Sequence, residues 1–167
     1  ADSVEKFADS AWNESKKKGF LKGLQSSSNI LGAYYNRTGD YSKALEQFNI
    51  SLNYAKELKD DKEIARQLFS MANSYTYRSD QPNALKYHLQ ALAIREKIND
   101  TLGIATSYNS IGYVYRAKND LQRTLSYYTK AKKLFEKFDS QSNLASAYAN
   151  SGGVCLRRIK LDSAVIF

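Results

Sequence analysis

Side chains suited to acid–base, nucleophilic or metal catalysis are scarce in this sequence. It holds a single histidine, His88, and a single cysteine, Cys155, so a transition-metal site has no adequate set of soft ligands. Both residues fall on apolar helical patterns, which favours packing over catalysis and predicts an inert buried thiol. Gly152 and Gly153 lie within a helical pattern rather than after a strand, so they do not indicate a phosphate-binding loop. We expect no enzyme activity and no cofactor.

Two further groups of side chains have both a chemical and a structural interpretation. Asp60, Asp61 and Glu63 suggest paired carboxylates, but a solvated turn between helices explains them better. The thirteen tyrosines suggest stacking on nucleic-acid bases beside a basic surface. Most of them, however, occupy positions at which the chain packs on itself, so we expect no nucleic-acid partner.

The bulk composition restricts the class of protein. A hydrophobic fraction of 43% and a charged fraction of 25% are typical of a globular chain rather than a disordered one. The net charge of +8 suits an acidic partner, although lysines that solvate the outer faces of helices explain it as well. No apolar run approaches the roughly 18 residues that a membrane span needs, so we expect no membrane insertion of this segment.

The elements that must position any binding residues come from a repeat of 40 residues. Residues 101–140 can be laid over 61–100 and over 21–60 without a gap. A fixed period of this length indicates stacked copies of one supersecondary unit. We predict a single all-α array, in which 1–19 form the second half of a repeat, 21–60, 61–100 and 101–140 form full repeats, and 141–167 form an incomplete repeat.

Each repeat has the pattern of two antiparallel helices. Aspartate is a good N-cap and recurs at the joints, at positions 40, 60, 80, 100 and 120. The expected first helices span about 21–37, 61–78, 101–118 and 141–158; the expected second helices span about 41–58, 81–98 and 121–138, with another beginning at 161–167.

The two ends of the sequence carry apolar helical patterns without the polar cap of a terminal repeat. This predicts that the sequence is part of a longer array. Apolar ends of this kind also allow end-to-end self-association.

Small and large residues follow a fixed order along both helices of a repeat. In the third repeat Tyr108, Ile111, Gly112 and Tyr115 share one helix stripe. A residue no larger than alanine at the Gly112 position lets the partner helix approach closely. The equivalent small residues are Gly32, Ala72 and Gly152, and the second helices supply the bulky residues Phe48, His88 and Tyr128.

This order of residues resembles the tetratricopeptide repeat over essentially the whole chain. The usual period of that family is about 34 residues, so a period of 40 lengthens each helix by roughly a turn. Ser51, Thr124 and Cys155 depart from the family pattern, and the last repeat matches it least well. The resemblance implies a right-handed superhelical array of antiparallel helix pairs. The long form is similar to arrays in bacterial sensor kinases, nucleotide cyclases and transcription regulators.

The resemblance also implies that the first helix of each pair lines a concave groove. Asparagine amides both donate and accept hydrogen bonds and can hold a peptide backbone, while arginine pairs with carboxylates. The alternative is that these asparagines only tolerate a solvated surface. The implied groove residues are Asn29, Ala33, Asn36, Arg37, Arg66, Phe69, Asn73, Tyr77, Asn109, Tyr113, Arg116 and Arg157.

The implied function is a non-enzymatic scaffold that binds a protein or an extended peptide, acidic in character. The implied setting is the sensory or regulatory region of a larger bacterial signalling protein, such as a sensor histidine kinase. Such a region lies in the cytoplasm, or in the periplasm if the kinase is membrane-anchored. Two alternatives stay open: a peptide-sensing regulator of the response-regulator phosphatase type, and a structural spacer that assembles with itself.

Overall fold

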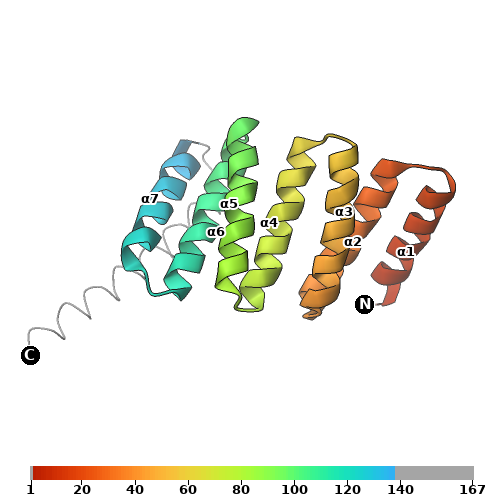
Figure 1. Ribbon diagram of the computed structural model, residues 1–167, viewed down its shortest axis with the longest axis horizontal. Helices are drawn as coiled ribbons and strands as arrows, with labels where there is room; N and C mark the ends of the chain where they lie inside the picture. The colour runs from red at the N-terminus through yellow and green to blue at the C-terminus, as the bar shows by residue number, and fades with distance from the viewer. Residues whose placement is uncertain (1, 138–167) are drawn as a thin grey trace, which may run out of the picture. The chain divides into compact units, whose positions relative to one another are not determined.

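The structure, a computed structural model, describes residues 2–137 (Figure 1). All regular structure in this range is α-helical, and the expected helix ends are confirmed to within one residue. The two helices expected at 141–158 and 161–167 lie outside the described residues. The helices are α1 (Asp2–Lys17), α2 (Leu21–Thr38), α3 (Tyr41–Glu57), α4 (Asp61–Tyr77), α5 (Gln81–Lys97), α6 (Thr101–Ala117) and α7 (Leu121–Lys137).

One type of turn joins the helices and recurs every 20 residues. At the end of α3 the chain takes a positive φ of 54° at Lys59, and the backbone N–H of Asp60 donates to the Ala55 carbonyl at 3.0 Å. The Asp60 carboxylate then accepts from the backbone N–H of Glu63 at 3.0 Å and caps α4. The predicted aspartate caps are confirmed at four further joints, where Asp40, Asp80, Asp100 and Asp120 accept at 3.0–3.2 Å from the backbone N–H three positions ahead. At the α1–α2 joint Phe20 takes the cap position, and no side chain caps α2.

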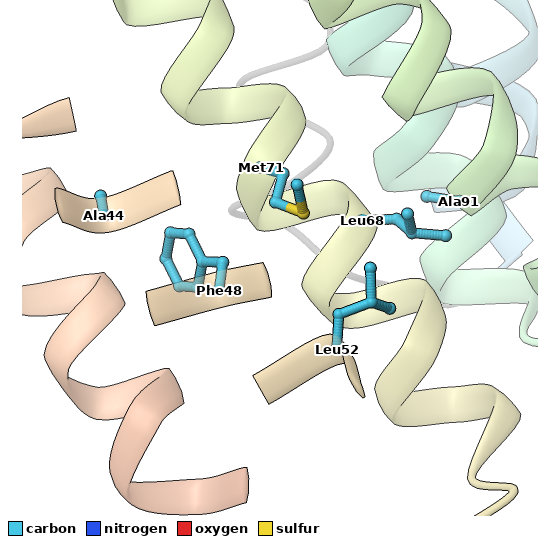
Figure 2. Close-up of a cluster of buried hydrophobic side chains, with 6 residues drawn as sticks. All are labelled: Ala44, Phe48, Leu52, Leu68, Met71 and Ala91. Atoms are coloured by element: carbon cyan, nitrogen blue, oxygen red, sulfur yellow. The ribbon is translucent and has the colours of Figure 1, made fainter. Parts of the chain in front are cut away.

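The chain divides into two compact units, with the boundary between Ile94 and Arg95. In the first unit α2 packs against α1 and α3, and α3 packs against α4 (Figure 1). Figure 2 shows the core of this unit, which the apolar stripes of α3, α4 and α5 build together. Its buried members are Ala44, Phe48, Leu52, Leu68, Met71 and Ala91.

Close helix contact in this unit depends on the predicted pairing of small and bulky residues. A Cβ atom at Gly32 would lie 2.6 Å from ring carbons of Phe48, so the glycine lets α2 and α3 approach. The equivalent pair of the next repeat, Ala72 and His88, is buried. The His88 ring makes an edge contact with Phe69, with 5.1 Å between ring centroids. The histidine therefore has the packing position that the sequence predicts.

In the second unit α6 packs against α7 around Ala105, Ala131 and Phe135. A Cβ atom at Gly112 would lie 2.6 Å from the Tyr128 ring, which repeats the arrangement of Gly32 and Phe48. The pairing of small and bulky residues thus recurs in both units.

The buried Arg95 holds the end of α5 to α6 in the second unit. Its Nη1 donates to the Gly103 carbonyl at 2.9 Å and to the Ser107 hydroxyl at 2.7 Å. Burial lowers the pKa of Arg95, and the nearby Asp100 carboxylate partly opposes this shift. A Cβ atom at Gly103 would overlap Asp100 Oδ2 and lie 2.9 Å from Arg95 Cδ, so a larger residue there would displace these side chains.

Candidate binding groove

A groove of about 480 Å³ lies in the first unit, over α2 and α4. On α2 and on α4 its residues lie three, four or seven positions from the first of them, which places them on one face of each helix. The lining combines amides, an arginine and aromatic rings, and five of its residues belong to the predicted set: Ala33, Asn36, Arg37, Asn73 and Tyr77. The complete lining is Ala33, Asn36, Arg37, Tyr41, Phe48, Ser70, Asn73 and Tyr77.

A hydrogen bond between the two helices fixes one amide of the groove. The Ser74 hydroxyl of α4 donates to Asn36 Oδ1 of α2 at 3.1 Å. Because the oxygen of this amide accepts from Ser74, its nitrogen is the part that can donate to a ligand. Asn36 is thus oriented by the fold before any ligand binds.

Aromatic rings form the second feature of the groove. Tyr41, the first residue of α3, stacks on Tyr77 of α4 with 5.7 Å between ring centroids and 25° between ring planes. The Tyr77 side chain is 61% exposed, so a ligand can reach its ring. The stack offers a flat apolar surface beside the polar amides.

The charge of the groove comes from Arg37. This side chain is exposed and makes no ion pair with another residue that the structure describes. A guanidinium in this state can form a bidentate pair with a carboxylate. The groove therefore combines a cation with two amides, one of them held by Ser74, and an aromatic surface.

Three predicted residues of this unit lie outside the groove lining. Arg66 Nη2 forms an ion pair with Glu63 Oε2 at 2.5 Å, so its charge is compensated within the chain. Phe69 packs against the core cluster and the His88 ring. Asn29 is half-buried on α2. The groove therefore uses residues of the C-terminal halves of α2 and α4, and these three residues precede the lining residues on each helix.

A polar network links α2, α3 and α4 outside the groove lining. Gln25 Nε2 of α2 donates to Ser51 Oγ of α3 at 3.1 Å and to Glu63 Oε2 of α4 at 3.0 Å. Gln25 is completely buried, so breaking these bonds would leave polar atoms without partners in the core. At the edge of the network, Lys22 pairs with Asp60 at 3.0 Å. Asp60 and Glu63 thus have structural partners, which agrees with their interpretation as residues of a turn between helices rather than as paired catalytic carboxylates.

The remaining predicted residues belong to the second unit or lie outside the described range. Asn109, Tyr113 and Arg116 share one face of α6, with spacings of four and three residues. The Arg116 guanidinium lies over the Tyr113 ring at 4.7 Å from its centroid. Tyr113 is 43% exposed, so this pair is accessible on the helix surface. Arg157 lies outside the described residues.

Sequence reasoning did not find three residues of the groove: Tyr41, Phe48 and Ser70. The sequence indicates only a packing role for Phe48, whereas the structure places it in both the core cluster and the groove lining. Ser70 lies one turn before Asn73, so the helical period could have found it. Tyr41 carries no such indication, because its contact with Tyr77 joins residues of two different helices.

Comparison with known proteins agrees with this architecture. The model of the tetratricopeptide repeat family matches residues 24–97, which contain the whole groove. Residues 24–97 are thus a tetratricopeptide repeat segment. No curated protein sequence matches it. Tetratricopeptide repeat folds generally act as protein-interaction scaffolds without enzyme activity of their own.

Several solved structures share this repeat fold. BtubC (BKLC) from P. vanneervenii is 20% identical with a TM-score of 0.82, covering 99% of this chain and 69% of that one. The tetratricopeptide repeat domain of Arabidopsis FLU is 26% identical with a TM-score of 0.66, covering 70% of this chain and 98% of that one. A Rap protein complexed with Competence and Sporulation Factor is 17% identical with a TM-score of 0.74, covering 85% of this chain and 40% of that one.

The part of the chain that the structure describes has two further properties that bear on function. None of its helices is both long and apolar enough to cross a membrane. Within residues 2–137, no group of three or more histidine, cysteine, aspartate or glutamate side chains is placed to hold a metal ion.

Proposed function

We propose that the first unit binds an extended peptide segment of a partner protein in the groove over α2 and α4. The observation that carries the proposal is the convergence of Asn36, Arg37, Asn73 and the exposed Tyr77 on one surface. Asparagine amides hold the peptide backbone, and the Tyr77 ring packs against an apolar side chain of the segment. Because Arg37 supplies the charge, the segment carries a carboxylate near its contact with that residue.

Selection from a random peptide library identifies a probe for this proposal. A peptide enriched on the whole chain is synthesised, and its dissociation constant is measured by isothermal titration calorimetry. We expect Asn73→Ala to weaken binding about tenfold, because one hydrogen bond and the fit of the groove are lost. Arg37→Glu should weaken binding further, since it places like charges together.

The matched control for Asn73→Ala is Asn53→Ala, an exposed asparagine of α3 that lies outside the groove lining. Circular dichroism verifies that helicity is unchanged in each variant. If no peptide is enriched, or if Asn53→Ala weakens binding as much as Asn73→Ala, the proposal is wrong.

The broader setting that we propose is the sensory or regulatory region of a larger bacterial signalling protein, such as a sensor histidine kinase. A second candidate, a peptide-sensing regulator of the response-regulator phosphatase type, has the support of a shared fold with a Rap protein complexed with Competence and Sporulation Factor. Dephosphorylation of a response regulator by the full-length parent protein would favour the second candidate. A third candidate, a self-assembling spacer, requires concentration-dependent oligomers in sedimentation.

A further inference from the structure

A second groove lies in the second unit, on a surface that the proposed peptide site does not use. Its volume is about 770 Å³, and α6 and α7 provide most of its lining. On α6 it uses Ile104 and Tyr108, which are one turn apart, and not the stripe of Asn109, Tyr113 and Arg116. The lining is Glu96, Thr101, Ile104, Tyr108, Lys130, Lys133, Leu134, Glu136 and Lys137.

The floor of this groove is apolar. Ile104 and Tyr108 on α6 lie along it with Leu134 on α7, and Tyr108 and Leu134 are only partly buried against the core of the unit. Residues spaced four apart on a helix are roughly 5–6 Å apart. A docked helix has the same spacing between its own apolar residues, so its stripe can match the floor.

One edge of the groove is cationic. Lys130 is held between two rings, with its Nζ 5.5 Å from the Tyr108 centroid and 5.3 Å from the Tyr127 centroid. Lys133 and Lys137 follow it at three and seven positions, so the three cations share one side of α7. Lys133 and Lys137 are exposed to solvent.

The two carboxylates in the lining already have partners. Glu96 Oε1 accepts from the Tyr108 hydroxyl at 3.2 Å, and Glu136 pairs with Lys132 at 3.7 Å. Three lysines against two glutamates leave the lining with a net positive charge, and the cations lie together along α7. An apolar floor beside a cationic edge is complementary to a ligand with an apolar face bordered by carboxylates.

We propose that this groove binds an acidic amphipathic helix of a partner protein. Apolar residues at steps of three and four on that helix pack on Ile104, Tyr108 and Leu134, and its flanking glutamates or aspartates pair with Lys130, Lys133 and Lys137. A volume of about 770 Å³ accommodates two or three apolar side chains of such a helix. This site is separate from the groove over α2 and α4 and does not depend on it.

The test uses a synthetic 15-residue peptide with blocked ends, a leucine stripe at helical spacing and flanking glutamates. Its binding to the whole chain is measured by fluorescence anisotropy. We expect saturable binding that weakens about tenfold in Lys133→Glu/Lys137→Glu, because two attractive pairs become repulsive. The control is Lys62→Glu/Lys118→Glu, which changes two exposed lysines outside the lining by the same total charge and should alter affinity less than twofold.

Two further measurements separate groove binding from general attraction between charges. The same peptide with asparagine in place of leucine should lose binding, and the amide chemical shifts that move on titration should cluster at residues 101–108 and 130–137. Equal weakening by both double variants, tight binding of the asparagine peptide, or shifts elsewhere would overturn the proposal. Absence of saturable binding would overturn it too, including the case in which the chain's own residues beyond 137 already fill the groove.

Discussion

At the scale of single residues, glycine permits the close helix contact on which each repeat depends. At Gly32 and Gly112 the space of a Cβ atom is taken by the rings of Phe48 and Tyr128. The repeat between them has alanine at the equivalent position, opposite the smaller imidazole of His88. Position 32 and its facing ring therefore act as a volume pair, and a change in one should be compensated by a change in the other.

This pair gives a prediction for stability. Gly32→Ala should lower the free energy of unfolding by about 1–2 kcal/mol, because overpacking against Phe48 exceeds the gain of roughly 1 kcal/mol in helix propensity. Phe48→His should also destabilise the protein. The double variant recreates the Ala72–His88 pair and should be more stable than the sum of the single changes implies.

Urea unfolding of the four proteins in this double-mutant cycle measures the coupling. A coupling free energy near zero would contradict the volume pairing. Gly112→Ala against Tyr128 provides the same measurement in the second unit.

At the scale of helices, the turn between consecutive helices holds one residue in a left-handed backbone conformation, and the type of that residue differs from turn to turn. The φ values are 54° at Lys59, 59° at Ser79, 55° at Asn99 and 59° at Asn119, while Gly39 has 88°. A left-handed conformation costs an L-residue with a side chain roughly 1–2 kcal/mol and costs glycine little. Four turns thus take a positive φ, as the α2–α3 turn does, without glycine at that position.

Exchanging residues between two equivalent turns tests this point. We expect Ser79→Gly to raise the free energy of unfolding by about 0.5–1 kcal/mol, and Gly39→Ser to lower it by a similar amount, after allowing for the larger entropy of glycine in the unfolded chain. Thermal unfolding measures both changes. Ser79→Ala, which keeps the positive φ and a Cβ atom, serves as the control and should give no gain. A loss of stability in Ser79→Gly would refute the argument.

At the scale of the whole chain, the capping aspartates make the stability of the fold depend on pH in the acidic range. The backbone N–H of Lys43 lowers the pKa of Asp40, the backbone N–H of Glu63 lowers the pKa of Asp60, and the Asn83 side chain lowers the pKa of Asp80. Because these pKa values lie below those of the unfolded chain, about 3.9, the caps contribute fully above that pH. Their contribution is lost as the pH falls through the lower folded pKa values.

We therefore expect the contribution of these caps to the unfolding temperature to be constant above about pH 5. Below about pH 4 the unfolding temperature should fall steadily. The triple variant Asp40→Asn/Asp60→Asn/Asp80→Asn keeps neutral N-caps that do not titrate. Its unfolding temperature should fall less between pH 5 and pH 2.5. An equal fall in the two proteins would show that other groups determine the acid sensitivity.

The sequence by itself determined the helices and their ends. Helix caps depend on residues three positions apart, such as Asp60 and Glu63, and the tetratricopeptide pattern of small and bulky residues repeats at fixed spacing. These interactions are local or strictly periodic, so they can be recognised without coordinates. The resemblance to that family implied Asn36, Arg37, Asn73 and Tyr77 as groove residues, and all four line one groove of the structure.

Only the tertiary structure decided which polar side chains the groove contains. Arg66 and Arg37 were equivalent candidates in the sequence, but Glu63 pairs with Arg66 and leaves Arg37 to supply the charge of the groove. Tyr41 enters the groove because its ring stacks on Tyr77 of another helix. Both outcomes depend on the conformations of neighbouring side chains. A side chain with several rotamers adopts one of them only when the helices around it are packed together.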